Sequence, residues 1–199
     1  MGAIWVIEAA SVRARSVALV VHGLYNLGIM IVKSKWIAVA SGLAAAAWGQ
    51  PLDARVSNTQ GKSVWLAQLR GKPTVLFYED KDSTAENQAL KDELFRQGRE
   101  KGLLDAATVI AIANVQGFDW FPAKNFVVSA VKDAEKASGI PVYLDWSGTL
   151  STRPWNLSPK GSTVLVFDAK GERLFSRTGK LTGPEIAQVF GLLATLVAR

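Results

Sequence analysis

The sequence predicts a single α/β sandwich domain, and two patterns carry that prediction. Apolar stretches of strand length at Pro73–Tyr78, Thr108–Ala113 and Pro141–Leu144 alternate with amphipathic stretches of helical length. Two further strand-like stretches, Thr163–Phe167 and Arg173–Phe175, flank a turn. Strand–helix–strand order favours parallel strands joined by helical crossovers, and the closing pair favours an antiparallel hairpin. We therefore expect three layers, with a central mixed sheet flanked by helices.

Each expected element has a local reason. The stretch Pro73–Tyr78 is continuously apolar and rich in β-branched and aromatic residues, as in a strand buried on both faces. Gly61–Trp65 predicts a turn and a short strand, and Asp168–Gly171 predicts the hairpin turn. Pro184 suits the first turn of a final helix. Apolar residues recur near one face of each expected helix: Ala85, Ala89, Leu90, Leu94 and Phe95; Phe126, Val127, Ala130, Val131 and Ala134; and Ile186, Val189, Phe190, Leu193, Leu196 and Val197.

Residues 1–49 form a region upstream of this domain. Lys33 and Lys35 precede a short apolar segment, residues 36–47, and the small residues Ala47 and Gly49 follow in A-x-G order. A basic segment, an apolar segment and a small-residue cleavage site in this order are typical of a secretory signal peptide. We expect translation to start at Met30, cleavage to occur near Gly49, and the folded domain to cover residues 50–199 in the periplasm or outside the cell.

A membrane anchor is the alternative interpretation of the same region. Residues 16–32 contain no formally charged side chain, although His22 and Asn26 interrupt their apolar character. Their length is at the lower limit for a membrane-spanning helix. If this segment stays uncleaved, it is the part of the chain that we expect to contact the membrane.

The composition excludes several classes of chemistry. The 199 residues contain no cysteine, so this chain forms no disulfide, thiolate nucleophile or zinc–thiolate site. The one histidine, His22, lies in the leader, so cleavage there would remove the imidazole that catalytic triads and most metal sites use. We expect no cofactor and no metal. A net charge of +6 without a cluster of basic and aromatic residues argues against nucleic-acid binding.

Three segments resemble a known family. Gly61–Pro73 is similar to the entry segment of the redoxin branch of the thioredoxin-like superfamily, and Thr163–Gly171 resembles its hairpin. Gly179–Thr182 fits the approach to its final helix. Among the relatives, the chain is most similar to the cysteine-free, periplasmic YtfJ-like proteins, whose insert before the hairpin resembles Asn125–Asp145. The resemblance, which spans about residues 52–197, implies a thioredoxin-like fold.

The resemblance also implies where the family's chemistry would lie. In thiol-active relatives a Cys-x-x-Cys or single-Cys loop follows the strand that corresponds to Pro73–Tyr78. Asp82, Ser83, Thr84 and Ala85 stand at that place here, and Ser162 stands where the family has a cis-proline. We therefore interpret these five residues as vestigial active-site positions without redox activity.

The segment Glu79–Thr84 allows two interpretations. Asp80 and Asp82 after an apolar strand are typical of Asp-based phosphohydrolases, with Asp80 as nucleophile and Asp82 as general acid. The other interpretation is helix initiation, because Ser83 and Glu86 have capping-box spacing and carboxylates favour a helix amino end. We favour helix initiation. An anion site at residues 82–85 and a Ca²⁺ site using Glu79 are weaker alternatives.

Aromatic residues gather at Phe118–Pro122, and Trp146 and Trp155 follow. They predict either an exposed surface for a peptide or protein, or core packing under a long loop. The possible binding residues are Tyr78, Glu79, Asp80, Trp120 and Trp146.

The leading functional hypothesis is an exported, redox-inactive, non-enzymatic binding module with a protein or peptide partner in the cell envelope. A phosphohydrolase using Asp80 and Asp82 is one alternative. A redoxin by descent with a residual or partner-dependent redox role is the other.

Overall fold

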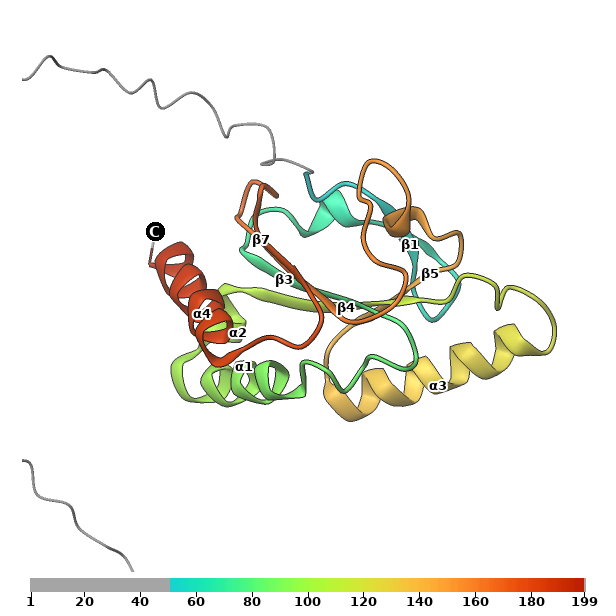
Figure 1. Ribbon diagram of the computed structural model, residues 1–199, viewed down its shortest axis with the longest axis horizontal. Helices are drawn as coiled ribbons and strands as arrows, with labels where there is room; N and C mark the ends of the chain where they lie inside the picture. Colours follow the sequence, from blue (N-terminus) through green and yellow to red (C-terminus); the bar gives the residue numbers. More distant parts are fainter. Residues whose placement is uncertain (1–50, 199) are drawn as a thin grey trace, which may run out of the picture. The chain divides into compact units, whose positions relative to one another are not determined.

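The computed structural model of the chain describes residues 51–198, and Figure 1 shows how its elements are arranged. The strands are β1 (Arg55–Ser57), β2 (Ser63–Trp65), β3 (Thr74–Glu79), β4 (Thr108–Asn114), β5 (Val142–Asp145), β6 (Thr163–Phe167) and β7 (Arg173–Thr178). The helices are α1 (Gln88–Lys101), α2 (Leu103–Ala106), α3 (Ala123–Ser138) and α4 (Gly183–Val197), with short 3-10 helices η1 (Leu66–Leu69) and η2 (Thr149–Ser151). The expectations for the leader, including Met30, Gly49, the anchor segment and a domain start at residue 50, lie outside the described residues.

The strands form one mixed sheet in the order β2-β1-β5-β4-β3-β6-β7. Strands β3, β4 and β5 are parallel, and the remaining neighbours pair antiparallel, including the β6–β7 hairpin. The predicted α/β class and mixed sheet are confirmed. Strand β1 was not expected, because three residues are too few to reveal a period of two.

Two apolar clusters cover the two faces of the sheet. On one face Leu90 and Leu94 of α1 pack with Val189 and Leu193 of α4 against the inward side chains of β3 and β6. On the other face the coil between β5 and β6 packs Leu150, Trp155 and Leu157 against the sheet, and Trp155 meets Phe167 edge to face. In Figure 1 the helices α1, α3 and α4 lie on the same side of the sheet.

Helix α1 begins later than the sequence suggested. It starts at Gln88, and residues 81–87 form consecutive turns instead of a first helical turn. The expected capping box at Ser83 and Glu86 is therefore wrong. The Ser83 hydroxyl accepts a hydrogen bond from the Asp80 backbone N–H, and the Glu86 carboxylate is bound to the backbone N–H of Ser162. The bond of Ser83 is a local turn contact, whereas the Glu86 carboxylate is committed to a tertiary contact that the local pattern does not reveal.

The other two long helices differ in how they pack. Helix α4 begins with a capping box between Thr182 and Glu185, one residue from the expected Pro184, and buries Val189 and Leu193, whereas Val197 is exposed. Helix α3 forms where it was expected but buries none of its residues, and Phe126 is 72% exposed. In residues 51–198 there is no helix long and apolar enough to cross a membrane.

Candidate functional site

The vestigial positions lie at the carboxyl end of β3, next to the turn that precedes β6. Asp82, Thr84 and Ala85 are exposed, whereas Ser83 and Ser162 are buried at 2% and 0% exposure. Ser162 is followed directly by β6 and therefore stands beside the end of β3, to which β6 is paired. The structure thus brings the two groups of positions that the resemblance singled out to one place.

A buried carboxylate connects these positions. Glu79, 5% exposed, accepts hydrogen bonds from the Lys91 ammonium at 2.8 Å and from the Ser162 hydroxyl at 2.8 Å. Lys91 Nζ also donates to the Thr84 carbonyl at 2.8 Å, and its ammonium lies 5.1 Å from the centre of the Phe77 ring. A buried charge needs a partner of opposite charge and further hydrogen bonds, and Glu79 has both.

Asn87 extends this network to the last helix. Its side-chain amide donates to Ser162 Oγ at 2.9 Å and to the Gly179 carbonyl at 3.1 Å, and its Oδ1 accepts the Leu181 N–H at 2.9 Å. The backbone N–H of Ser162 is bound to Glu86 Oε2 at 3.0 Å. We call Glu79, Glu86, Asn87, Lys91 and Ser162 the polar network. It joins β3, α1, the turn before β6 and the approach to α4.

The electrostatics of the network suit a structural role. Burial raises the pKa of Glu79, and the hydrogen bond and charge of Lys91 act in the opposite direction, as does the hydrogen bond from Ser162. Each polar side chain in the network is bound to others in the chain, so its atoms are occupied internally. These internal bonds hold the end of β3, α1 and the turn before β6 together.

An open groove lies beside the polar network, between α1 and α3. It encloses about 940 Å³. Its floor comes from Ala111 and Ala113 of β4 and Val142 of β5, and its walls come from the facing sides of the two helices, including Phe95 of α1 and Val131 of α3. Figure 1 shows α1 and α3 on the same side of the sheet. We call it the α1–α3 groove.

The sequence of β4 explains why the groove is open. Its side chains alternate between faces, and Ile110 and Ile112 fill the opposite cluster while Ala111 and Ala113 face the helices. These two small side chains give α3 little to pack on, so the space above them stays open. Helix α3 contributes Val127 and Val131, with Ala130 and Ala134, to the groove and buries none of them fully.

The α1 end of the groove carries charged side chains. Glu79, Asp80, Lys81, Lys91 and Asp92 line it. Asp80 Oδ1 is buried and accepts no hydrogen bond from residues 51–198, whereas the neighbouring Lys81 and Asp82 form an exposed ion pair at 3.8 Å. The groove thus combines an apolar body with charged side chains at one end.

The acidic residues do not gather into a metal site. Within residues 51–198 no three side chains of the His, Cys, Asp and Glu types stand close enough together to hold a metal ion. Asp82 is solvent-exposed, with 76% side-chain exposure. Asp80 and Asp82 therefore lie in the same loop, but no third metal-ligating side chain of residues 51–198 joins them.

Tyr78 lies in the core at 1% exposure, and its hydroxyl donates to Asp145 Oδ2 at 3.3 Å. Asp145 also accepts the backbone N–H groups of Thr149 and Leu150, at 2.8 and 2.9 Å, and so fixes the start of η2. Burial and the Asp145 carboxylate raise the pKa of the Tyr78 phenol. The contacts of Tyr78 are those of a structural side chain.

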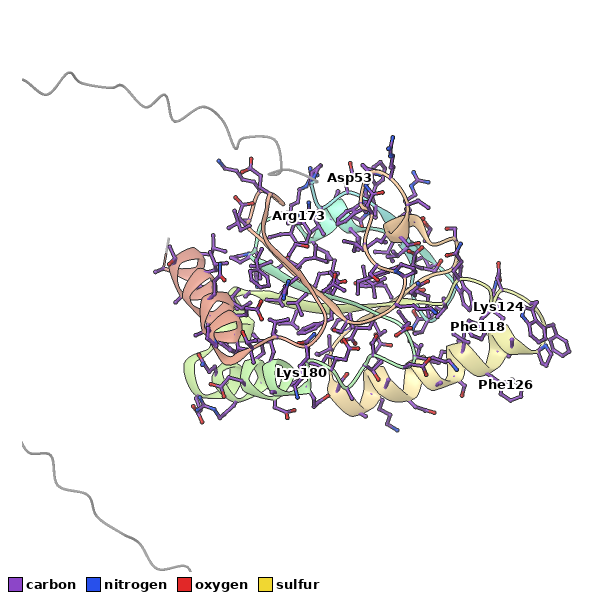
Figure 2. The ribbon with its side chains drawn as sticks, in the orientation of Figure 1. Asp53, Phe118, Lys124, Phe126, Arg173 and Lys180 are labelled. Carbon is purple, nitrogen blue, oxygen red and sulfur yellow. The ribbon has the colours of Figure 1, made fainter. Side chains whose placement is uncertain are left out.

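The aromatic residues divide between the two interpretations. Trp155 is 4% exposed and belongs to the core, whereas Phe118, Trp120 and Phe121 are 38%, 58% and 82% exposed. Trp146 is half-buried beneath the Lys124 ammonium, which lies 5.0 Å from its ring centre. Figure 2 shows Phe118, Lys124 and Phe126 together at the amino-terminal end of α3.

The fold and the altered site define a class: this is a thioredoxin-like domain. Three solved structures share the fold. They are a protein described as a DsbE thiol:disulfide interchange protein from Chlorobium tepidum (TM-score 0.55, 16% identity, 75% of this chain and 96% of that one), an exposed lipoprotein thioredoxin from Streptococcus pneumoniae (0.53, 17%, 72% and 99%), and an uncharacterized thioredoxin-like protein from Porphyromonas gingivalis (0.52, 22%, 75% and 92%).

The particular family follows from the sequence. Residues 57–196 match the model of the family described as bacterial protein of unknown function (YtfJ_HI0045), and the chain belongs to this family. A comparison with curated protein sequences found no match. The predicted relationship to YtfJ-like proteins is thereby confirmed.

Sequence reasoning found Glu79 and Ser162 but missed their partners Lys91 and Asn87. Asn87 and Ser162 are 75 positions apart, and Glu79 and Ser162 are 83 positions apart. Contacts of that separation leave no trace in local periodicity. The alanine pair on β4 is the one sequence signal that could have indicated the groove.

Proposed function

We propose that this protein is an exported, redox-inactive thioredoxin-like binding module that takes an apolar peptide segment of a partner protein into the α1–α3 groove. The observation that carries the proposal is the groove itself, a hollow of about 940 Å³ between two helices. Apolar grooves between helices suit the apolar face of a peptide helix. The absence of cysteine from the chain supports a binding role over thiol exchange.

The charged end of the groove suggests which peptide is preferred. The carboxylates of Glu79, Asp80 and Asp92 outnumber the ammonium groups of Lys81 and Lys91 at this end, and Glu79 is already paired with Lys91. The surplus of negative charge favours a ligand that brings an ammonium group to this end. We therefore expect a peptide with an apolar body and a basic end to bind better than an acidic one.

Export to the cell envelope is part of the proposal. The signal-peptide pattern of residues 30–49 supports it, and the description of the Streptococcus pneumoniae neighbour as an exposed lipoprotein is compatible with it. Sequencing the amino terminus of the protein isolated from the envelope tests this part. We expect Gln50 as the first residue, and an amino terminus at Met1 would contradict cleavage.

Binding is tested with a defined probe. The probe is a fluorescein-labelled peptide of about 14 Leu and Ala residues with a terminal Lys, roughly 21 Å long as a helix. We call it the Lys-ended peptide. One control peptide carries Glu in place of Lys, and another carries Ser in place of Leu. We expect saturable binding of the Lys-ended peptide, measured by fluorescence anisotropy, and no binding of the Ser peptide.

Two variants locate the binding site. Ala113→Phe fills the groove from its floor, and we expect it to weaken the affinity about tenfold because a large part of the apolar contact is lost. Ala194→Phe places the same ring on the exposed side of α4 and is the matched control. Equal affinities for the two variants, with thermal unfolding showing both to be folded, would refute the groove as the site.

Asp80→Asn tests the charged end separately. We expect it to remove the preference for the Lys-ended over the Glu-ended peptide while leaving the apolar contribution to binding intact.

Insulin reduction by the purified protein tests the redox-inactive part of the proposal. We expect no insulin reduction.

A further inference from the structure

The exposed aromatic residues beside the groove belong to a second surface. Trp120 and Phe121 in the β4–α3 loop and Phe126 in the first turns of α3 are 58%, 82% and 72% exposed. None of the three lines the α1–α3 groove, which reaches this region with Phe118. We call Trp120, Phe121 and Phe126 the aromatic tip. Three large aromatic side chains exposed within seven positions are unusual for a surface that faces only water.

Several polar groups at the tip are paired within the chain. The Trp120 indole N–H donates to the Gly117 carbonyl at 3.1 Å, and the Trp120 carbonyl accepts the Lys124 N–H at 2.9 Å. Pro122 has no N–H, and its carbonyl accepts the Asn125 N–H at 3.1 Å. The tip can therefore enter an apolar medium without leaving these groups unpaired.

The charges at the tip cancel. Lys124 Nζ binds Asp119 Oδ1 at 2.6 Å and also lies over the Trp146 ring. A protein interface typically offers a hydrogen bond for every 100–200 Å² and a polar rim. Here the charges of Lys124 and Asp119 and the indole N–H of Trp120 are already paired within the loop and the first turn of α3. This arrangement suits an apolar medium, in which a protein surface forms few hydrogen bonds.

We propose that the aromatic tip is a docking surface for a zwitterionic phospholipid membrane, entered by Trp120, Phe121 and Phe126. Tryptophan and phenylalanine side chains favour the boundary between headgroups and acyl chains. Figure 2 shows Phe126 and Lys124 at the end of α3 that lies away from α4, where a flat surface can approach them. The sequence alone placed membrane contact in the leader, and the tip adds a contact within the folded domain.

The test uses the full chain, in which the absence of cysteine permits a single engineered label. Phe126→Cys carries an environment-sensitive NBD fluorophore, and Lys170→Cys in the β6–β7 turn carries the same label as the control. Vesicles are made of phosphatidylcholine, with or without brominated acyl chains that quench a fluorophore at the membrane interior. Any binding through the leader is common to both labelled proteins.

We expect the label at position 126 to become brighter and blue-shifted on addition of vesicles and to be quenched by the brominated chains, while the label at position 170 responds to neither. Adding Trp120→Ala and Phe121→Ala to the Phe126→Cys protein should lower the apparent partition coefficient about tenfold or more, since two apolar side chains no longer insert. Trp65→Ala in the same protein removes another exposed tryptophan and should change nothing.

The neutral tip also predicts weak dependence on salt and on anionic lipid, because no net charge drives the association. A label at position 126 that is unaffected by phosphatidylcholine vesicles would overturn the proposal, and so would equal quenching at positions 126 and 170. A label that responds to a protein fraction of the envelope but not to vesicles would also overturn it, in favour of a protein partner.

Discussion

The two ends of the helical face of the sheet differ in how they are filled. At one end α1 and α4 bury leucine and valine side chains against β3 and β6, and the polar network satisfies the buried charge of Glu79. At the other end α3 lies over Ala111 and Ala113 and buries no residue. The helical face is thus packed beneath β3 and β6 and open beneath β4 and β5. Binding is proposed to take place in this open part.

The largest expected difference between the two ends is in stability. Leu94→Ala, at a site 2% exposed, should lower the free energy of unfolding by about 3 kcal/mol, because the truncation leaves a cavity in a packed core. Val131→Ala in α3, which is half-buried, should cost less than about 1 kcal/mol. Urea unfolding monitored by circular dichroism compares them. Equal costs would mean that α3 is packed as tightly as α1.

The next effect concerns the amide that joins the network to α4. Asn87→Ala should lower the free energy of unfolding by about 2 kcal/mol, because it leaves the Leu181 N–H without its acceptor and removes the amide donor to the Gly179 carbonyl. Asn125→Ala on the exposed surface of α3 is the matched control and should cost little. If both substitutions were neutral in urea unfolding, the network would not hold the two helices together.

The smallest effect is a dependence on pH. Burial raises the folded-state pKa of Glu79 above its ordinary value of 4.5, so between these two values the folded state holds a proton that the unfolded state has released. The stabilisation is present below pH 4.5 and is lost as the pH rises through the raised pKa. The difference in unfolding free energy between the natural protein and Glu79→Gln should therefore fall with rising pH. A difference that grows with pH would show that Lys91 outweighs burial.

Much of the fold could be predicted from the sequence, because continuous apolar strands such as Thr74–Glu79 and Thr108–Asn114 are recognisable locally. The start of α1 could not be predicted, because the side chains of Glu86 and Asn87 form hydrogen bonds with Ser162 and with the segment that leads into α4. The apolar period of α3 predicted a helix correctly. It could not reveal that the apolar side faces a groove, since periodicity reports which face is apolar and not what covers it.

Only part of the candidate site could be predicted from the sequence. The resemblance located Asp82–Ala85 and Ser162, and the missing cysteines indicated that thiol chemistry is absent. The polar network cannot be read from the sequence, because Glu79 and Asn87 bind Ser162, which is distant in the chain. The groove cannot be read from it either, because the space above Ala111 and Ala113 exists only in the packed structure.

Amide hydrogen exchange measured with and without the Lys-ended peptide tests the central claim most directly, because it reports on both ends of the helical face at once. Without peptide, the amides of α1 should exchange more slowly than those of α3, since buried packing protects them. With peptide, protection should rise over residues 126–138, which form one wall of the groove. A rise over residues 82–87 with none in α3 would contradict the account and place binding at the end of β3 instead of between the two helices.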